Sequence, residues 1–377
     1  MSATGDGPAA ELAAAGLYDE TAPDAEDRLD LLTFLLEQGC TIDDLVAAEA
    51  AGRLVTAASD AMLRKGQTPL RAEEIAALAG IDRELIRAWR TLGFPDPPDD
   101  AAVWWPSDAD IFAQFDVGAE LFGAERMAQF SRVLGRAAAQ VAEAAVALFL
   151  TEVQAPLERG AIPPVELARA NVTAQLALNA IPTVFEAAFR HHVDATQRRT
   201  QETPFSDDRR RATMCVAFAD LVGSTELAHR LDPAGTARLA ADLEEVATDT
   251  VARSGGRLVK TIGDGVLFTT PAPADALAIA TALVEWAASD DRLEGLRVGM
   301  AAGPVVWQDG DVHGPVVNLA ARLCAAAGRG QILVDAGFAD AAGDDRPPLS
   351  LSGHLTLRGF ADPVPAFTPT ARPNSRQ

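Results

Sequence analysis

The sequence has few cysteines and few basic residues. Its three cysteines, Cys40, Cys215 and Cys324, lie far apart in apolar surroundings and show no CxxC spacing. Such cysteines are typical of reduced core thiols in the cytosol and argue against a disulfide framework. Lys and Arg number 32 against 54 Asp and Glu, so the formal net charge is −22. This balance argues against a broad surface for bulk DNA or anionic lipid.

A long apolar run and a targeting signal are also missing. The most apolar stretch, Val141–Leu150, is interrupted by Glu143 and is too short to cross a bilayer. The first 20 residues are acidic and rich in Ala and Gly, and they lack the basic segment that begins a secretion signal. We therefore expect a soluble cytoplasmic protein with no membrane span.

The pattern that is present changes near residue 212. Before this point apolar residues recur at helical spacing, and after it short apolar strands alternate with helices. A charged stretch that contains Pro204 separates the two patterns. The expected segments are a disordered N-terminus at 1–24, an all-α domain at 25–190, a linker at 191–211, an α+β domain at 212–369 and a tail at 370–377.

The helical half contains a segment, 68–115, with helix-turn-helix spacing. We expect a helix over Ala72–Ala79, a turn at Gly80 and a second helix over Arg83–Leu92. The segment resembles the start of a MerR-type winged-helix domain. A DNA reader needs several basic side chains along the second helix, whereas the arginines here are offset by acidic neighbours. We interpret the segment as a structural module, and a DNA-binding regulator is the alternative.

Two long Ala-rich helices are predicted next, Ala119–Glu158 and Pro164–His192. Their weakly polar faces need a partner, and a helical dimer interface is one interpretation of them. A self-contained helical bundle is the other interpretation.

The second half has the element order βαββαβ with additions at its end. This order predicts an α+β, ferredoxin-like domain with a mainly antiparallel sheet. An Asp–Gly pair between two alternating apolar runs is its strongest hairpin signal. The predicted elements are strand 213–219, helices 223–231 and 233–253, the hairpin RLVKTI–GDG–VLFTT, helix 273–288, strand 296–303, helix 316–327 and strand 331–335.

The stretch CVAFADLVGST joins a buried strand to a helix. The strand stops at Asp220, the chain turns at Gly223, and Ser224 or Thr225 caps the helix that follows. A carboxylate beside the free N–H groups of a helix N-terminus suits a metal–triphosphate ligand. An ordinary strand-to-helix turn with a capping Asp is the competing interpretation.

A second carboxylate, Asp264, lies at the tip of the predicted hairpin. The first strand and this hairpin are neighbours in a ferredoxin-like sheet, so Asp220 and Asp264 can share two divalent cations at one edge. Taken alone, Asp264 would be a turn residue. Its pairing with Asp220 makes it a candidate metal ligand.

The segment DVHGPVVNLAARL carries an amide and a guanidinium on one predicted helix. Asn318 and Arg322 are four residues apart and project from the same helix face. Both groups donate hydrogen bonds and add no negative charge, which suits a phosphorane-like transition state. A solvated helix pair is the alternative, although Asn is a poor mid-helix residue.

These three motifs together resemble the catalytic domain of the class III nucleotidyl cyclases over residues 212–365. The matching motifs are FADLVGST, KTIGDG and the spacing from Asp311 through Asn318 to Arg322. A diguanylate cyclase would instead show a GG[DE]EF hairpin. Carried over by position, the resemblance implies that Asp220, Asp264 and the backbone of Leu221 hold the metal ions, that Asn318 and Arg322 are catalytic, that Lys260 and Asp311 select the purine, and that Phe218, Gly223, Ser224, Thr225 and Arg297 contact the substrate.

The resemblance also implies a reaction and an assembly. The ribose 3′-oxygen of ATP would attack the α-phosphorus, giving 3′,5′-cyclic AMP and pyrophosphate, with two Mg²⁺ or Mn²⁺ ions per site. A Lys donor and an Asp acceptor match N1 and N6 of adenine, which favours ATP over GTP. In this family the metal pair comes from one protomer, and the purine-selecting pair and the Asn/Arg pair come from the other, so that Lys260 and Asp264 of one chain would serve different sites. We therefore expect a head-to-tail homodimer with composite sites.

The amino-terminal half is similar to the helical regulatory domain that precedes some actinobacterial cyclases, including pH-responsive ones. As a hypothesis, protonation of His191, His192 or His313 shifts the dimer between active and inactive packing, because these residues flank the linker or Asp311. Exposed histidines without a role are the alternative. A catalytically silent nucleotide-sensing module is the alternative for the whole chain.

Overall fold

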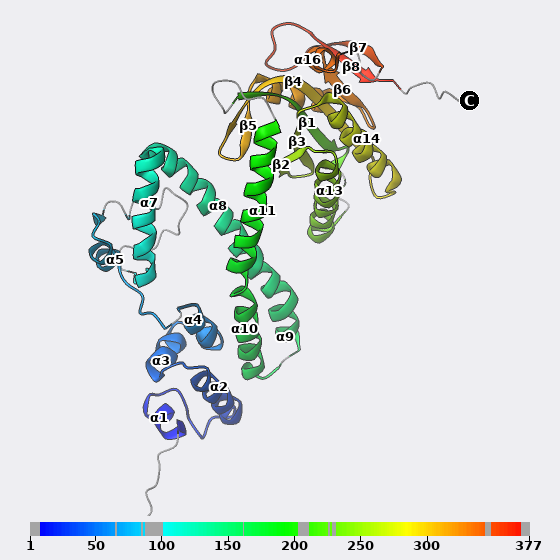
Figure 1. The fold of residues 1–377 in the computed structure, drawn as a ribbon. Helices are drawn as coiled ribbons and strands as arrows, with labels where there is room; N and C mark the ends of the chain where they lie inside the picture. Colours follow the sequence, from blue (N-terminus) through cyan, green and yellow to red (C-terminus); the bar gives the residue numbers. More distant parts are fainter. Residues whose placement is uncertain are drawn as a thin grey trace, which may run out of the picture. The chain divides into compact units, whose positions relative to one another are not determined.

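The computed structural model describes residues 8–64, 66–83, 86, 101–160, 162–202, 211–224, 227, 231–343 and 348–370. Within it the chain forms two compact units, Met1–Val193 and Asp194–Gln377. The first contains helices and one isolated β-bridge among its described residues, and the second is built on a sheet (Figure 1).

The first unit is a succession of helices that begins earlier than expected. Its α-helices are α1 (Pro8–Ala14), α2 (Ala25–Glu37), α3 (Ile42–Ala50), α4 (Ala57–Arg64), α5 (Ala72–Ala79), α7 (Ala109–Phe122), α8 (Ala124–Phe149), α9 (Ala155–Arg159), α10 (Pro164–Leu178) and α11 (Ile181–Glu202). The expected disorder over 1–24 is wrong for residues 8–24. Leu12 and Leu17 are buried in the core formed with α2, and these two apolar anchors order the segment.

The helix-turn-helix segment is described only in part. Its first helix, α5, ends at Gly80 in the left-handed conformation (φ 69°), as the glycine predicts. Ile75, Ile86 and Phe112 form a small buried cluster around it. The predicted second helix, Arg83–Leu92, falls almost entirely outside the described residues.

The predicted helix Ala119–Glu158 is divided. Gly123 separates α7 from α8 and has a φ of 88°, which is outside the helical region. Glycine adopts this conformation readily, whereas other L-residues rarely do. A π-helical turn (Leu150–Gln154) joins α8 to α9. Helix α11 continues to Glu202 through the first part of the expected linker, where an Asp194–Arg198 ion pair of 2.9 Å bridges one helical turn. The linker expectation is therefore corrected for residues 191–202, which are helical.

The expectation that the chain has no membrane span stays a prediction. Two helical stretches, Ala124–Leu157 and Pro164–Arg198, are long and apolar enough to cross a membrane by length and composition. The run Val141–Leu150 is only one part of the first of these stretches, Ala124–Leu157, so its short length does not represent the whole helical stretch. In the isolated chain only 6% and 11% of their apolar windows are buried. Length and composition do not separate a membrane helix from a helix that packs against another protein.

The second unit contains one mixed sheet. Its strands are β1 (Arg211–Leu221), β2 (Arg257–Ile262), β3 (Gly265–Thr270), β4 (Leu296–Gln308), β5 (Asp311–His313), β6 (Ile332–Asp335), β7 (Leu349–Leu355) and β8 (Val364–Pro369). Their order is β2-β3-β1-β4-β6-β8-β7, and β5 pairs with the end of β4. All pairs are antiparallel except β4–β6, which is parallel. The predicted mainly antiparallel sheet is confirmed.

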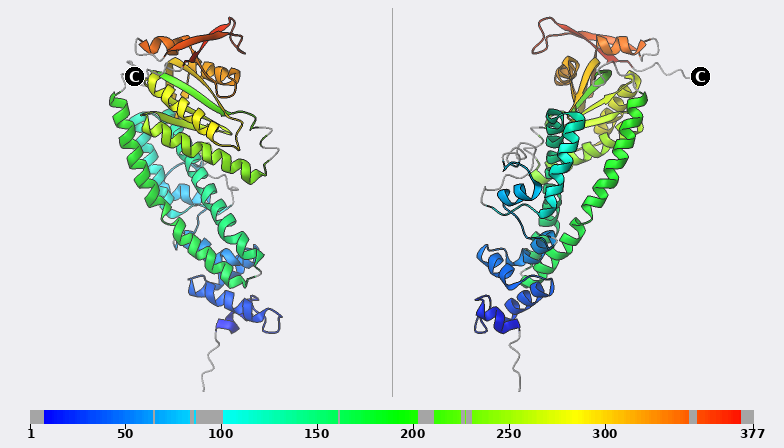
Figure 2. Two further views of the ribbon diagram at one scale, coloured as in Figure 1. Left: turned by 90° about the vertical axis from the view of Figure 1, so that its right-hand side faces the viewer. Right: turned by 60° about the vertical axis from the view of Figure 1, so that its left-hand side comes forward.

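Helices cover both faces of this sheet. Alternate residues of β1, including Ala217 and Ala219, pack against α13 (Pro233–Arg253) and α14 (Pro273–Ser289). The intervening residues, including Met214 and Val216, pack toward α15 (Pro315–Ala326). Figure 2 shows α13 and α14 on one side of the sheet, and the short helix α16 (Ala336–Ala341) follows β6. The strand period of two thus determines which side chains of β1 lie on the α15 face.

Candidate active site

Asp220 is the penultimate residue of β1 and lies on the α15 face of the sheet, directly opposite Arg297 on β4. Arg297 donates two hydrogen bonds to Oδ2 of Asp220, from Nε at 2.9 Å and from Nη2 at 2.5 Å. Burial raises the pKa of Asp220, the hydrogen bond from Arg297 lowers it, and the nearby charge of Asp264 raises it, so that the net shift is upward. The predicted substrate contact Arg297 is thus placed beside the predicted metal carboxylate.

The second predicted metal carboxylate lies next to the first. Asp220 pairs with Gly265 across β1 and β3, and the Leu221 amide donates to the Asp264 carbonyl at 3.2 Å. Glycine is required here, because a Cβ on Gly265 would lie 2.9 Å from the Ala219 carbonyl and 3.2 Å from Oδ1 of Asp220. The missing Cβ leaves room beside that carboxylate oxygen. The hairpin therefore brings Asp220 and Asp264 together at one edge, as predicted.

This edge fits divalent cations through the chemistry of its oxygen donors. Two carboxylates and a backbone carbonyl are ligands that Mg²⁺ and Mn²⁺ prefer, and Mg²⁺ commonly takes its other ligands from water and substrate phosphates. Within the described ranges no group of three or more His, Cys, Asp or Glu side chains is arranged to hold a metal ion. A cation bound by Asp220 and Asp264 would therefore need further oxygen ligands from elsewhere.

The turn after β1 is held by the loop that precedes β4. Gly223 adopts φ 72°, and the Val222 amide donates to the Gly295 carbonyl at 2.9 Å. The carboxylate of Glu294 lies over the turn, so that a Cβ on Gly223 would be 2.5 Å from its Oε2. Ser224 begins a helix, whereas Thr225, the other predicted cap, lies outside the described residues. Glu294 carries no sequence signal, since it reaches the turn from a distant part of the chain.

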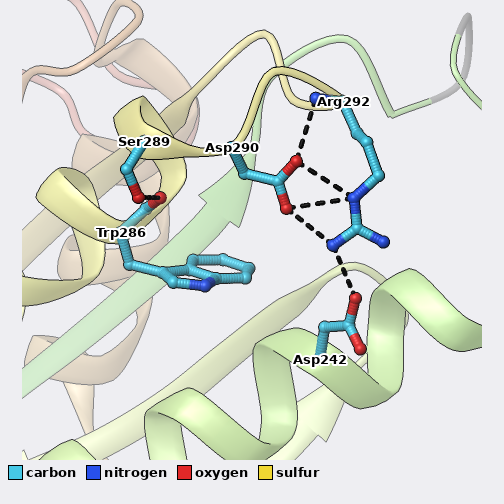
Figure 3. A network of polar contacts seen from close by, with 5 residues as sticks. All are labelled: Asp242, Trp286, Ser289, Asp290 and Arg292. Carbon is cyan, nitrogen blue, oxygen red and sulfur yellow. Dashed lines mark hydrogen bonds and ion pairs between the residues drawn. The ribbon is translucent and has the colours of Figure 1, made fainter.

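Hydrogen bonds of Arg292 hold the loop that precedes β4 in place (Figure 3). Arg292 donates to Asp290 and, through Nη2, to Asp242 of α13 at 2.7 Å. The hydrogen bonds that Arg292 donates to Asp290 and Asp242 raise its already high pKa further. The loop that carries Glu294 is therefore tied to α13.

Lys260 and Asp311, the predicted purine-selecting pair, form an ion pair with each other. Lys260 lies on β2 and donates from Nζ to Oδ2 of Asp311 at the start of β5. Burial alone would raise the pKa of Asp311, but the hydrogen bonds from Lys260 and the Val312 amide outweigh it and lower the pKa. Phe218, Leu267 and Lys260 are register partners across three strands, so the pair lies on the same face as Asp220.

Asn318 and Arg322 lie on the outer face of α15, and both are exposed. The opposite face of this helix packs so closely on β4 that a Cβ on Gly299 would lie 1.9 Å from the Cys324 amide nitrogen. Among the residues that the structure describes, no hydrogen bond or ion pair joins Asn318 or Arg322 to Asp220 or Asp264. One chain therefore places the two pairs on separate elements, and the helix spacing predicted for Asn318 and Arg322 is confirmed.

The fold consists of a helical unit followed by an α/β domain that gathers these polar side chains. Residues 207–359 match the family model for the adenylate and guanylate cyclase catalytic domain, and residues 9–188 match that for the adenylate cyclase regulatory domain. The chain belongs to the class III adenylate/guanylate cyclases that carry an N-terminal adenylate cyclase regulatory domain.

Curated relatives share both units. An adenylate cyclase of Streptomyces coelicolor is 34% identical over 72% of this chain and 71% of its own length. A pH-sensitive adenylate cyclase of Mycobacterium tuberculosis is 30% identical over 90% of this chain and 87% of its own length. Among solved structures, the adenylyl cyclase CyaB from P. aeruginosa aligns with 44% of this chain and 98% of its own chain, at 22% identity and a TM-score of 0.38.

Proposed function

We propose that this cyclase converts ATP into 3′,5′-cyclic AMP and pyrophosphate in the cytoplasm. The observation that carries the proposal is the Lys260–Asp311 ion pair, which holds an ammonium and a carboxylate side by side. A Lys ammonium donates to N1 of adenine, and an Asp carboxylate accepts from the N6 amino group. Guanine presents the opposite polarity at these positions. The names of the Streptomyces and Mycobacterium relatives support the same substrate.

The metal site of this proposal uses Asp220, Asp264 and the Leu221 carbonyl. Bound Mg²⁺ or Mn²⁺ would neutralise phosphate charge and make the ribose 3′-hydroxyl more acidic. Arg297 exchanges its bonds with Asp220 for bonds to the triphosphate, since a guanidinium binds phosphate and carboxylate in the same forked geometry. The turn at Gly223 and Ser224 presents backbone N–H groups to the same anion.

The bond changes follow from in-line substitution at the α-phosphorus. The 3′-hydroxyl loses its proton to solvent water, a bond forms between the 3′-oxygen and the α-phosphorus, and the bond from that phosphorus to the bridging oxygen breaks, so that pyrophosphate leaves. Asn318 and Arg322 donate hydrogen bonds to the charge that develops on the phosphoryl oxygens. In the proposed homodimer these two residues and the Lys260–Asp311 pair come from the second protomer, so that each of the two sites is composite.

A mixing experiment tests the composite site. The Asp220→Asn and Arg322→Ala chains, each purified alone, should form almost no cyclic AMP, because each supplies every site with one defective half. Mixed and allowed to exchange subunits, they should regain up to about half of the parent turnover per heterodimer, since one of its two sites is intact. No recovery despite heterodimers seen by mass spectrometry would contradict the composite site. Assays with ATP and GTP in parallel test the substrate.

The regulatory part of the proposal concerns pH. His191 and His192 lie exposed on α11, and His313 is exposed at the end of β5 beside the purine pair. We propose that their protonation shifts the dimer between packing arrangements. The double variant His191/His192→Ala should then lose part of the pH dependence of cyclic AMP formation. An unchanged profile would exclude the helix α11 histidines.

A further inference from the structure

The β4–β5 hairpin presents Asp311 from a turn of defined geometry. Asp309 and Gly310 connect the two strands with φ values of 55° and 82°. Two successive left-handed residues are typical of a type I′ turn, which sets the register of the strands it joins. In that register Gln308 pairs with Asp311 and Trp307 pairs with Val312. Asp311 is therefore the first residue after the turn.

This hairpin contacts β2, although the two are not neighbours in the sheet. Strands β3 and β1 separate β2 from β4 in the strand order. Contacts between β2 and β5 therefore require the hairpin to fold back over the sheet face. Backbone pairing between strands does not hold the hairpin in this position, so side chains must do so.

Arg257, the first residue of β2, is the side chain placed to do this. Its guanidinium carbon lies 4.2 Å from the ring centroid of Trp307 on β4. Its Nη2 donates to the Gly310 carbonyl at the tip of the turn, at 3.0 Å. A planar guanidinium can stack on an indole and donate in its own plane at the same time, which a Lys ammonium cannot do.

A β-bulge places Arg257 and Lys260 on the same face. Residues three apart in a regular strand point to opposite faces. Here the register shifts between Leu258 and Lys260, so that Arg257 pairs with Thr269 and Lys260 pairs with Leu267. Thr269 and Leu267 are two apart on β3 and therefore share a face. The bulge lets one short strand both hold the hairpin and supply its ion-pair partner.

We propose that Arg257 is a positioning residue for purine selection. By clamping Trp307 and the turn at Gly310 onto β2, it holds the Asp311 carboxylate where the adenine amino group is to be recognised. The inference rests on the proposed role of Lys260 and Asp311 in binding the base. Arg257 itself contacts no substrate in this scheme.

Three variants and one control test the clamp in the full-length chain. Arg257→Gln removes the stacking cation, Trp307→Leu removes the ring, and Arg257→Lys keeps the charge without the plane. Arg253→Gln, at the exposed end of α13, removes an arginine whose one ion pair among the described residues is with Asp249 of the same helix. The ratio of kcat/KM for ATP to that for GTP should fall about tenfold in the first two variants, the lower end of the discrimination that one base-reading pair supplies. The ratio for Arg257→Lys should lie between that of the parent and that of Arg257→Gln. The ratio for the control, Arg253→Gln, should equal that of the parent.

A double variant separates positioning from general damage. In an Asp311→Ala background, Arg257→Gln should change the ATP-to-GTP ratio no further, because the group that Arg257 positions is gone. The proposal would be overturned if Arg257→Gln lowered the ATP-to-GTP ratio further in the Asp311→Ala background. It would also be overturned if Arg257→Gln alone lowered kcat/KM for ATP and for GTP by the same factor. Thermal unfolding midpoints close to the parent value establish that the variants are folded.

Amide hydrogen exchange tests the clamp without any turnover. Residues 310–312 should exchange faster in Arg257→Gln than in the parent or in Arg253→Gln. Unchanged exchange would overturn the clamp even if cyclic AMP forms normally. A parent enzyme that forms no cyclic AMP would instead refute the proposed function, and faster exchange in Arg257→Gln would still support the clamp.

Discussion

At the scale of single residues, the charged groups of the site bind one another. Arg297 holds Asp220, and Lys260 holds Asp311. A metal–nucleotide ligand would replace both contacts: cations would take the place of the guanidinium at Asp220, and adenine would bridge the ammonium and the carboxylate of the second pair. Ligand binding then exchanges ion pairs within the protein for contacts with the ligand. Selectivity therefore depends on how well the ligand reproduces their geometry.

Gly223→Ala should impair nucleotide binding more than strain alone explains. The left-handed backbone costs a non-glycine residue about 1–3 kcal/mol, and the new Cβ would also meet the Glu294 carboxylate at 2.5 Å. Gly255→Ala is the control, because Gly255 has φ 66° with nothing within 4 Å of its Cβ position. We expect titration calorimetry with a non-cyclisable ATP analogue to show at least tenfold weaker binding only for Gly223→Ala. Equal affinities in both variants would contradict the crowding argument.

Purine selectivity should be independent of pH between 5.5 and 8.5. The Lys260 bond holds the pKa of Asp311 below its ordinary value of 3.8. An acid whose pKa is lowered on folding stabilises the folded state at pH values above its unfolded-state pKa. This stabilisation is lost only as the pH falls through the folded-state pKa. Asp311 thus stays ionised over the assay range. The ATP-to-GTP ratio of kcat/KM at the two pH limits checks this, and a change would assign the titration to a different group.

At the scale of elements, the position of Asn318 and Arg322 depends on how α15 packs on β4. Gly299 permits a backbone contact there, since its Cβ position is 1.9 Å from the Cys324 nitrogen and 2.4 Å from the Ala320 carbonyl. Both atoms belong to a helix backbone that cannot move aside locally. The helix that carries the predicted catalytic pair is thus placed by a residue with no side chain.

Gly299→Ala should therefore destabilise the catalytic unit by about 3 kcal/mol or more, the upper part of the range for overpacking. Gly303→Ala is a matched control on the same strand, because its Cβ would meet only the Val316 side chain at 3.8 Å. Chemical denaturation followed by tryptophan fluorescence measures both. A Gly299→Ala variant as stable as Gly303→Ala would show that α15 can shift outward at little cost.

At the scale of the whole molecule, α11 crosses the boundary between the two units and ends at Glu202, and residues 203–210 that follow it lie outside the described part of the chain. The division between them falls at residues 193 and 194, within α11. A helix transmits rotation and displacement more faithfully than a flexible linker does. Exposed apolar side chains on the long helices, including Phe130, Phe185 and Phe189, provide surface for the proposed dimer.

Removing the first unit should change how activity depends on pH. Cyclic AMP formation by the full chain and by residues 212–377 can be compared from pH 5.5 to 8.5 with Mg²⁺ and with Mn²⁺. If the helical unit controls the packing of composite sites, the two profiles should differ in shape as well as height, because small displacements alter the reacting geometry. Superimposable profiles, with both proteins shown to be dimeric, would remove the regulatory proposal.

Local patterns in the sequence were sufficient for much of this description. The strand ending at Asp220, the hairpin at Asp264 and the spacing of Asn318 and Arg322 each depend on periodicity or turn chemistry within a few residues. These features predicted the α+β domain, its mainly antiparallel sheet and the meeting of the two carboxylates. Such signals fail where stability comes from distant contacts. The ordering of residues 8–24 by Leu12 and Leu17 was missed for this reason.

Tertiary structure alone decided several of the contacts around the site. Arg297 lies opposite Asp220 because of the β1–β4 register, Glu294 reaches the turn at Gly223 from a distant loop, and a bulge turns Arg257 toward the β4–β5 hairpin. None of these contacts joins residues near one another in the chain. The sequence by itself determined the residue types and the local elements that carry the chemistry, because these follow from short-range sterics and hydrogen bonding. The partners of those residues were set by sheet register and backbone packing, which bring together segments that are distant along the chain.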